Sequence, residues 1–292
     1  MKLIHALSVL IFSLCFFSCS DDDGNPAPNY DSISYYITST KTSYTQADPF
    51  LVNNESLMRG NIVDNKFFSE TYFHPDGTEE TFQNFGYLDG KLNTYGGPYE
   101  GSKFYYATDG KLSGIDWSDD TMNTSFRRFS HHSGNVVYAD KMSERFEDAS
   151  AVVLSRVIVV LDSDDNIIKA GPDANLDGDM DQVNTFSYVN GNLVSAQLFT
   201  GGQLEYTYSN VRNNFSMLND NSFGKQVERL RYSELYALDY FSYHPMHSRN
   251  LTTTTISSGS YDVLDNGLYR KSTVNNVFST GQSLVATEFF FN

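Results

Sequence analysis

The chain has 292 residues, of which 40% are hydrophobic and 15% aromatic, and its formal net charge is −16. A chain of this length can bury a sizeable core in one large all-β domain or in two smaller ones. The strong acidity excludes nucleic acid as a partner, because contact with a phosphate backbone needs a basic surface. Tyr and Phe, with 20 and 22 copies, favour strands over helices.

The first 18 residues are predicted to form a secretory signal peptide. Lys2 precedes an apolar run from Leu3 to Phe17, and the small residue Ser18 stands before Cys19. The run is too short for a membrane span and is followed at once by acidic residues. The chain's two cysteines, Cys15 and Cys19, lie in or beside this segment, so we expect no internal disulfide after export.

The residues around Cys19 resemble the lipobox of bacterial lipoproteins. Phe16-Phe17-Ser18-Cys19 is similar to the Phe-rich boxes of Bacteroidota, and the acidic run Ser20–Asp23 resembles their export signal for the outer face of the outer membrane. The resemblance implies a lipid on Cys19 and exposure at the cell surface. The alternative is simple secretion with a solvated acidic stub. Residues 19–30 are expected to form a flexible tether, and residues 31–292 a single domain.

Strand and turn signals begin after the tether. Residues 33–44 alternate between apolar and polar and predict a first strand. Residues 46–61 are rich in turn formers and predict a connection. Residues 65–85 predict two strands joined by the turn His74-Pro75-Asp76-Gly77.

A short unit then recurs: an aromatic residue, turn residues ending in Gly, a polar residue and Leu. Its clearest example lies in residues 185–208, where Asn190-Gly191 and Gly201-Gly202 supply tight turns and predict a three-stranded meander. Other copies, some degenerate, are Tyr87–Leu92, Tyr105–Leu112, His132–Val136, Leu161–Ile168 and Asp265–Tyr269.

This unit resembles the YD-repeat (RHS-type) pattern, and residues 65–292 resemble a group of Bacteroidota lipoproteins that contain a YD-repeat-like domain of unknown function. The resemblance implies consecutive antiparallel hairpins, and it implies no activity or catalytic residue. We therefore predict an all-β fold of antiparallel hairpins in a long, curled and twisted sheet.

Two segments interrupt the β pattern. Residues 223–241 place Val227, Leu230, Leu235 and Leu238 among charged residues, which is compatible with an amphipathic helix packed on the sheet. Residues 141–150 are expected to form one or two helical turns.

An acidic loop matches part of the calcium-loop template. The Gly at its sixth position lets oxygen atoms from alternate residues converge on a hard cation. Position 12 is an asparagine rather than the usual bidentate glutamate, and the alternative is an acidic surface loop. We expect structural Ca²⁺ with the ligands Asp173, Asn175, Asp177, Asp179, Asp181 and Asn184.

The histidines and the usual catalytic motifs give no further site. Adjacent side chains at His131 and His132 would point to opposite faces of a strand. His244 and His247 are three residues apart beside Pro245, without the helix of a metalloprotease motif. No GxSxG, P-loop or helix-initiating GxGxxG sequence is present, so we expect no enzymatic activity from a known motif.

Aromatic residues near the single tryptophan are the candidate ligand-binding residues. Trp117, Tyr105 and Tyr106, with Tyr95 and Tyr99, could form a platform on which sugar rings stack. The alternative is that these rings form the core and cross-strand pairs of the sheet.

Three functions follow from these features. The first is a surface lipoprotein that binds a glycan or another envelope component, and the second is an adhesive or structural lipoprotein whose ligand is a protein, bound at an exposed strand edge. The third is a glycoside hydrolase that uses a carboxylate pair from Asp116, Asp119 and Asp120.

Overall fold

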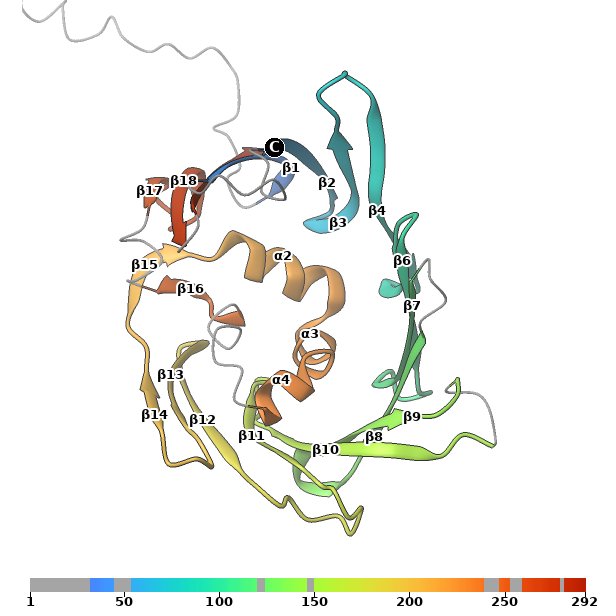
Figure 1. Ribbon diagram of the computed structural model, residues 1–292. Coiled ribbons are helices and arrows are strands. Elements are labelled where there is room, and N and C mark those ends of the chain that lie inside the picture. Colours follow the sequence, from blue (N-terminus) through green and yellow to red (C-terminus); the bar gives the residue numbers. More distant parts are fainter. Residues whose placement is uncertain are drawn as a thin grey trace, which may run out of the picture.

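The computed structural model describes residues 32–44, 54–119, 124–145, 150–238, 247–252, 259–278 and 281–292. Its main element is a 17-stranded antiparallel sheet that curls around three short helices (Figure 1). The first strands are β1 (Ile33–Tyr44), β2 (Asn54–Val63), β3 (Lys66–Phe73), β4 (Glu79–Leu88), β5 (Lys91–Gly96), β6 (Glu100–Tyr106), β7 (Leu112–Asp119), β8 (Thr124–His131) and β9 (Val136–Met142). The sheet continues with β10 (Val153–Leu161), β11 (Ile167–Pro172), β12 (Asn184–Val189), β13 (Asn192–Gln197), β14 (Gln203–Glu205), β17 (Gly259–Val263), β18 (Tyr269–Phe278) and β19 (Gly281–Phe291).

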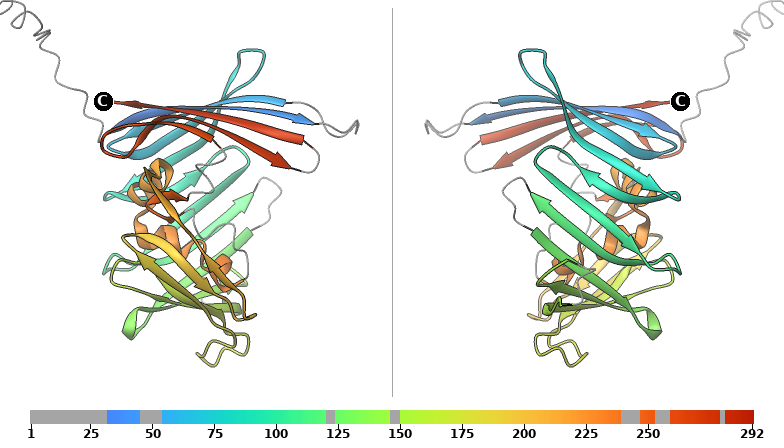
Figure 2. Two further views of the ribbon diagram at one scale, coloured as in Figure 1. Left: turned by 90° about the vertical axis from the view of Figure 1, so that its left-hand side faces the viewer. Right: turned by 90° about the vertical axis from the view of Figure 1, so that its right-hand side faces the viewer.

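The two ends of the domain are joined within the sheet. β1 pairs along its whole length with β19, from Ile33 opposite Phe291 to Tyr44 opposite Gly281. On its other side β1 pairs with β2, and from there each strand pairs with the next through to β14. The long strands β1, β2, β18 and β19 lie together along the top of Figure 2. The first and last strands of the domain are therefore neighbours in the sheet.

A two-stranded ribbon lies between the two ends of the main sheet. β15 (Tyr208–Arg212) follows β14, and β16 (Asn250–Thr252) precedes β17, and these two short strands pair with each other. The Arg212 amide donates to the Gly267 carbonyl, and the Arg249 amide donates to the Gly191 carbonyl. The ribbon is thereby attached to hairpin turns from both ends of the sheet.

The helices α2 (Asn214–Phe223), α3 (Lys225–Leu230) and α4 (Ser233–Ala237) occupy the space that the sheet encloses (Figure 1). Leu218, Leu230 and Tyr236 are fully buried there. The Phe223 ring lies 6.2 Å from Phe85. The inner face of the sheet and the helices therefore share one apolar core, which stabilises both.

The structure confirms the all-β prediction and most of the predicted hairpins. The strand predicted at 33–44 is β1, and the segment 65–85 forms β3 and β4 around the turn at His74–Gly77. The segment 185–208 forms β12, β13 and β14, with Tyr208 beginning β15. The turn residues Asp89, Asn190 and several glycines have positive φ, as tight hairpin turns require.

Two local predictions were wrong in the described residues. The connection predicted at 46–61 is strand β2 from Asn54 onward, because β1 and β3 pair with it on both sides. Helical turns were predicted at 141–150, but Lys141 and Met142 are the last residues of β9 and pair with β10. Residues 146–149 lie outside the described part of the chain.

The helix predicted at 223–241 is divided into α3 and α4, and residues 239–241 lie outside the described residues. Val227 and Leu230 are buried as predicted, whereas Leu238 is 48% exposed. α2 was not predicted from the sequence, although Asn213 caps its first turn by accepting a hydrogen bond from the Ser216 amide. No helix in the described ranges has the length and apolarity needed to cross a membrane.

Candidate functional site: a hollow on the outer face of the sheet

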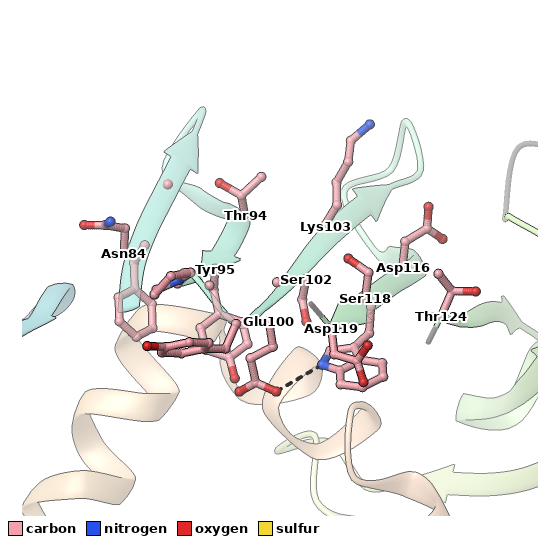
Figure 3. A pocket seen from close by; sticks show the side chains of 18 of the residues that line it. Asn84, Thr94, Tyr95, Glu100, Ser102, Lys103, Asp116, Ser118, Asp119 and Thr124 are labelled. Atoms are coloured by element: carbon pink, nitrogen blue, oxygen red, sulfur yellow. Dashed lines mark hydrogen bonds between the residues drawn. The ribbon is translucent and has the colours of Figure 1, made fainter. Parts of the chain in front are cut away.

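Side chains alternate between the two faces of strands β4 to β8. Tyr95 and Phe104 point inward, because their rings lie 6.0 and 6.1 Å from that of Phe223 on α2. Lys103 and Tyr105, on either side of Phe104, therefore point outward. Figure 3 shows Thr94, Lys103 and Asp116 on the side of the strands away from the helices.

A hollow of about 810 Å³ lies on this outer face, a size typical of small-molecule sites. Four glycines line it: Gly86, Gly96, Gly97 and Gly101. A Cβ atom added to Gly101 would have its nearest neighbour 3.8 Å away, so the space above this glycine is open. The aromatic residues around the hollow include Phe68, Tyr105 and Phe126, and its polar residues include Asn84, Thr94, Lys103, Asp116 and Ser118.

Tyr105 and Asp116 form the polar centre of the hollow. The Tyr105 hydroxyl donates a 2.8 Å hydrogen bond to Asp116 Oδ2. Lys103 Nζ lies 4.6 Å from the centroid of the Tyr105 ring and forms a cation–π contact with it. Asp116 Oδ1 is buried and accepts no hydrogen bond from the described residues. A buried carboxylate oxygen without a donor favours a ligand that brings a hydroxyl or amide group.

The turn between β5 and β6 borders the hollow and depends on two glycines. Gly96 has φ 158°, and the Gly97 amide donates to the Glu100 carbonyl at 2.8 Å. A Cβ atom on Gly97 would lie 1.7 Å from the Phe82 carbonyl oxygen, so only glycine fits. The next residues, Pro98 and Tyr99, also line the hollow. The Gly96-Gly97 pair therefore allows the β5–β6 turn to pack closely against the backbone at Phe82 at this end of the hollow.

Trp117 lies on the other face from Tyr105. It is opposite Ser102 in the β6–β7 register and points inward, and its Nε1 atom donates a 3.4 Å hydrogen bond to Glu100 Oε2 (Figure 3, dashed line). It lines one end of the outer hollow and also a smaller inner hollow of about 290 Å³ that includes Arg127 and Arg231. Trp117 therefore lies where the two hollows approach each other.

Tyr106 also points inward, away from the outer hollow. Its hydroxyl donates to the Leu92 carbonyl at 2.8 Å, and burial raises its pKa to about 12. The predicted ligand-binding residues Trp117, Tyr105 and Tyr106 therefore do not form a single platform. Of the three, only Tyr105 projects from the outer face.

The carboxylates on either side of Trp117 point to opposite faces of β7. Asp116 faces outward, and Asp119, three positions along the same strand, faces inward. Asp120 lies outside the described residues. The hydrolase hypothesis requires two carboxyl groups in one cleft. Asp116 and Asp119 both line the hollow, from opposite faces of β7, and hydrolase activity stays a prediction.

The predicted calcium loop folds over the outer face beside β9 and β10. The fully buried Asp173 carboxylate accepts hydrogen bonds from the Asp177 and Gly178 amides at 3.1 Å and pairs with Arg156 at 3.4 Å. Asp181 Oδ2 accepts from the Ala174 amide at 2.7 Å. In the described ranges no three His, Cys, Asp or Glu side chains are grouped so as to hold a metal ion. Calcium binding stays a prediction.

Asn184, the predicted twelfth ligand, holds α4 against the sheet. It is fully buried, and its Nδ2 atom donates to the Tyr236 and Ala237 carbonyls at 2.9 and 3.3 Å. Its Oδ1 atom accepts from the Phe199 amide at 2.9 Å. A role as a calcium ligand would require this side chain to leave these partners. The exposed members of the loop are Asn175, Asp177, Asp179 and Asp181.

The histidines have structural contacts in the described chain. His131 Nε2 lies 2.8 Å from the Leu112 carbonyl oxygen, and the His132 ring packs 4.1 Å from that of Tyr138. His247 is buried beside Glu228, and His244 lies outside the described residues.

A polar cluster inside the curl of the sheet was not predicted from the sequence. Glu228 and Arg229 on α3 are 1% and 2% exposed, and Arg229 Nη1 donates to Asp220 Oδ1 at 3.0 Å. Charged residues in a helix usually face solvent, so the pattern of residues 223–241 gave no sign of this burial. The ion pair of Asp220 with Arg229 joins α2 to α3, so it could be predicted only if α2 had been identified.

No family model matches the chain, and no curated protein matches it. Among solved structures, a porin-like protein from Bacteroides uniformis has a TM-score of 0.38 at 10% identity, covering 89% of this chain and 96% of its own. A porin-like protein from Bacteroides vulgatus has a TM-score of 0.25 at 10% identity, covering 89% of this chain and 98% of its own. The TcdB2-TccC3 structure without its hypervariable C-terminal region has a TM-score of 0.30 at 13% identity, covering 84% of this chain and 14% of its own. These likenesses assign neither a family nor an activity.

Proposed function

We propose that this protein is a surface-exposed lipoprotein that binds glycans in the hollow on the outer face of β4 to β8. The observation that carries the proposal is the Tyr105–Asp116 pair. It places an aromatic ring beside a buried carboxylate oxygen that lacks a hydrogen-bond donor. Sugars present an apolar ring face and hydroxyl donors, and this combination of groups suits both.

The rest of the hollow supports the same ligand class. Gly101 leaves room against the sheet for a flat ring, because a Cβ atom there would have its nearest neighbour 3.8 Å away. Phe68 and Phe126 supply further apolar surface. Phe68 is 55% exposed, which is unusual for a large apolar side chain and typical of a contact surface.

The location at the outer membrane is part of this proposal and rests on residues 1–23. A Cys19→Ser variant should leave the membrane fraction and become soluble, because the lipid would no longer be attached. Protease added to intact cells should cleave the wild-type protein. A wild-type protein that stays uncut on intact cells would contradict exposure at the surface.

A glycan array in millimolar calcium tests the binding function, with the chain from residue 25 onward as the probe. Wild-type protein should give reproducible hits that Tyr105→Ala abolishes. Tyr35→Ala is the matched control. The Tyr35 ring also has a cation beside it, with Arg59 at 4.7 Å, and stacks on Phe290, yet it lies on β1 and outside the hollow.

The other outcomes decide between locations and ligand classes. Loss of binding in Trp117→Ala with binding retained in Tyr105→Ala would place the site at Trp117, where the outer and inner hollows approach each other, and away from the Tyr105–Asp116 pair. A blank array with folded protein would contradict glycan binding. It would favour the alternative of a protein ligand, which adds a strand to an edge of the sheet.

A further inference from the structure

A second cavity, of about 650 Å³, lies inside the curl of the sheet. We infer that it binds a small molecule bearing an oxyanion, either the carboxylate of a sugar acid or a phosphate group. Its walls come from α2 and α3, from the turns of the β10–β11 and β12–β13 hairpins, and from the segment that leads into β16. These elements lie close together only in the folded chain (Figure 1).

The charges that line the cavity favour an anion. Its basic residues are Arg212, Lys225, Arg229 and Arg249, and its acidic residues are Asp162, Asp164 and Asp220. Asp162 is used within its own turn, where it accepts hydrogen bonds from the Asp164 amide and from both nitrogens of Asn166. Asp220 is paired with Arg229. Three basic groups therefore remain, on Arg212, Lys225 and Arg249, against the one carboxylate of Asp164.

Arg229 is the buried group that points to a ligand. Its side chain is 2% exposed, Nη1 donates to Asp220 Oδ1 and Nη2 donates to the His247 carbonyl, each at 3.0 Å. The third nitrogen, Nε, is buried and has no hydrogen-bond partner among the described residues. A buried donor without an acceptor is unfavourable, and an oxyanion in the cavity would supply the acceptor.

Arg212 and Arg249 lie at the side of the cavity that opens to solvent. Neither forms an ion pair in the described part of the chain, and the only side-chain hydrogen bond of Arg212 there is a 3.8 Å contact to the Met217 sulfur. Arg249 is exposed, with its Cβ next to Gly191 at the β12–β13 turn. Two unpaired guanidinium groups at an opening attract anions and can bind them in a bidentate manner.

A smaller groove of about 420 Å³ continues from this opening and shares Asn190, Arg212 and Arg249 with the cavity. Asn210, also in the groove, is exposed and adds another amide group. Amides donate and accept hydrogen bonds, so the groove suits the hydroxyl groups of a sugar acid more than it suits free phosphate. This site does not include the outer-face hollow, and its existence does not depend on glycan binding there.

Isothermal titration calorimetry of the full chain in detergent tests the inference with three probes: glucuronate, inorganic phosphate and glucose. At least one of the two anions should bind, and neutral glucose should bind at least tenfold more weakly than that anion. Tighter binding of glucuronate identifies a sugar-acid site, and tighter binding of phosphate identifies a phosphate site. The affinity should fall as salt rises from about 50 to 500 mM, because the contacts are ionic.

Variants locate the binding. Arg249→Gln and Arg212→Gln should each weaken anion binding at least tenfold. Arg270→Gln is the matched control, because Arg270 loses the same charge on β18 and lies outside the cavity. Asp220→Asn should strengthen binding severalfold, since it removes the carboxylate that competes for Arg229. A general loss of structure would not produce that increase.

Folded wild-type protein that gives no heat with either anion would overturn the inference. Equal losses in Arg249→Gln and Arg270→Gln would also overturn it, because binding would then depend on net charge alone. Circular dichroism of each variant shows whether the fold is retained. Failure of the glycan array has no bearing on these titrations, so the two proposals can fail separately.

Discussion

Glu228 and His247 face each other in the interior of the protein, with Glu228 Oε1 3.7 Å from His247 Nδ1 and the two side chains 1% and 3% exposed. Burial raises the pKa of Glu228 to about 7. The charges of Arg231 and Arg229 lower this pKa by less, and the charge of Asp220 raises it. Neither oxygen of Glu228 accepts a hydrogen bond from the described residues. The folded state therefore holds this proton at pH values where the unfolded chain has released it.

The first prediction is a loss of stability as pH rises. Because the pKa of Glu228 is higher in the folded state, the stabilisation is complete below the ordinary glutamate pKa and is lost as pH rises to about 7. Glu228→Gln should remove up to about 3 kcal/mol of this pH dependence. The measurement is the free energy of unfolding in urea at pH 5 and pH 7.5.

Glu205→Gln on β14 is the control for that experiment, because Glu205 is exposed. It should leave the pH dependence of the wild-type protein unchanged. If Glu228→Gln and the wild-type protein lose the same stability between pH 5 and pH 7.5, the burial of Glu228 does not control the effect.

The second prediction concerns the Gly-Gly turn beside the outer hollow. Gly97→Ala should destabilise the protein by about 2 kcal/mol, because its Cβ atom would lie 1.7 Å from the Phe82 carbonyl oxygen and the turn would have to shift. Gly101→Ala should change stability by less than about 1 kcal/mol, since the nearest atom is 3.8 Å away. Denaturant unfolding of the two variants compares them. Equal destabilisation would show that the turn tolerates a side chain as well as the strand does.

The third prediction concerns the ion pairs beneath the acidic loop. Asp140 is 1% exposed and accepts from Arg128 at 2.9 Å and from Arg156 at 2.6 Å, and Arg156 in turn pairs with Asp173. Asp140→Ala should cost about 3 kcal/mol, because two guanidinium groups would lose their shared carboxylate, one of them mostly buried. Unfolding in urea measures the loss.

Asp262→Ala provides the contrast on the surface. The Asp262–Arg270 pair is 3.4 Å long and about half exposed on both sides. Its removal should change stability by less than about 0.5 kcal/mol. If Asp140→Ala changed stability as little as Asp262→Ala does, the acidic loop would not depend on the buried ion pairs of Asp140, Arg156 and Asp173.

The fourth prediction concerns calcium. If the loop at 173–184 binds Ca²⁺ with the roughly 10⁻⁴–10⁻³ M affinity of extracellular modules, then 10 mM Ca²⁺ should stabilise the protein by about 1–3 kcal/mol. The melting temperature should therefore be higher in calcium than in chelator. Asp177→Asn combined with Asp179→Asn should abolish the shift, whereas Asp164→Asn in the β10–β11 turn should not. Identical melts of the wild-type protein in calcium and chelator would contradict a structural role for calcium.

Local signals in the sequence were sufficient for the hairpins. Asp89-Gly90 and Asn190-Gly191 both have the positive φ angles expected of their tight turns. Turn chemistry involves only a few neighbouring residues, so it can be recognised without the fold. The connection predicted at 46–61 was wrong from Asn54 onward because its turn-forming residues outweighed a weak alternation that pairing with β1 and β3 stabilises as a strand.

The sites could be predicted only in part. The aromatic and acidic residues near Trp117 were identified from the sequence, but their distribution between two faces depends on the register of β6 and β7. Tyr105 and Asp116 are 11 positions apart, yet a hydrogen bond joins them because the two strands are neighbours. Asn184 matches the last position of a calcium template, and only the fold shows that its side chain donates to α4.

The sequence by itself determined the all-β class and the positions of most turns, because strand alternation and turn residues are local properties. Only the tertiary structure decided that β1 pairs with β19 and that three short helices fill the curl of the sheet. It also decided that Arg229 and Glu228 are buried within that curl. Long-range pairing and burial depend on residues far apart in the chain, and no local pattern specifies which of them meet.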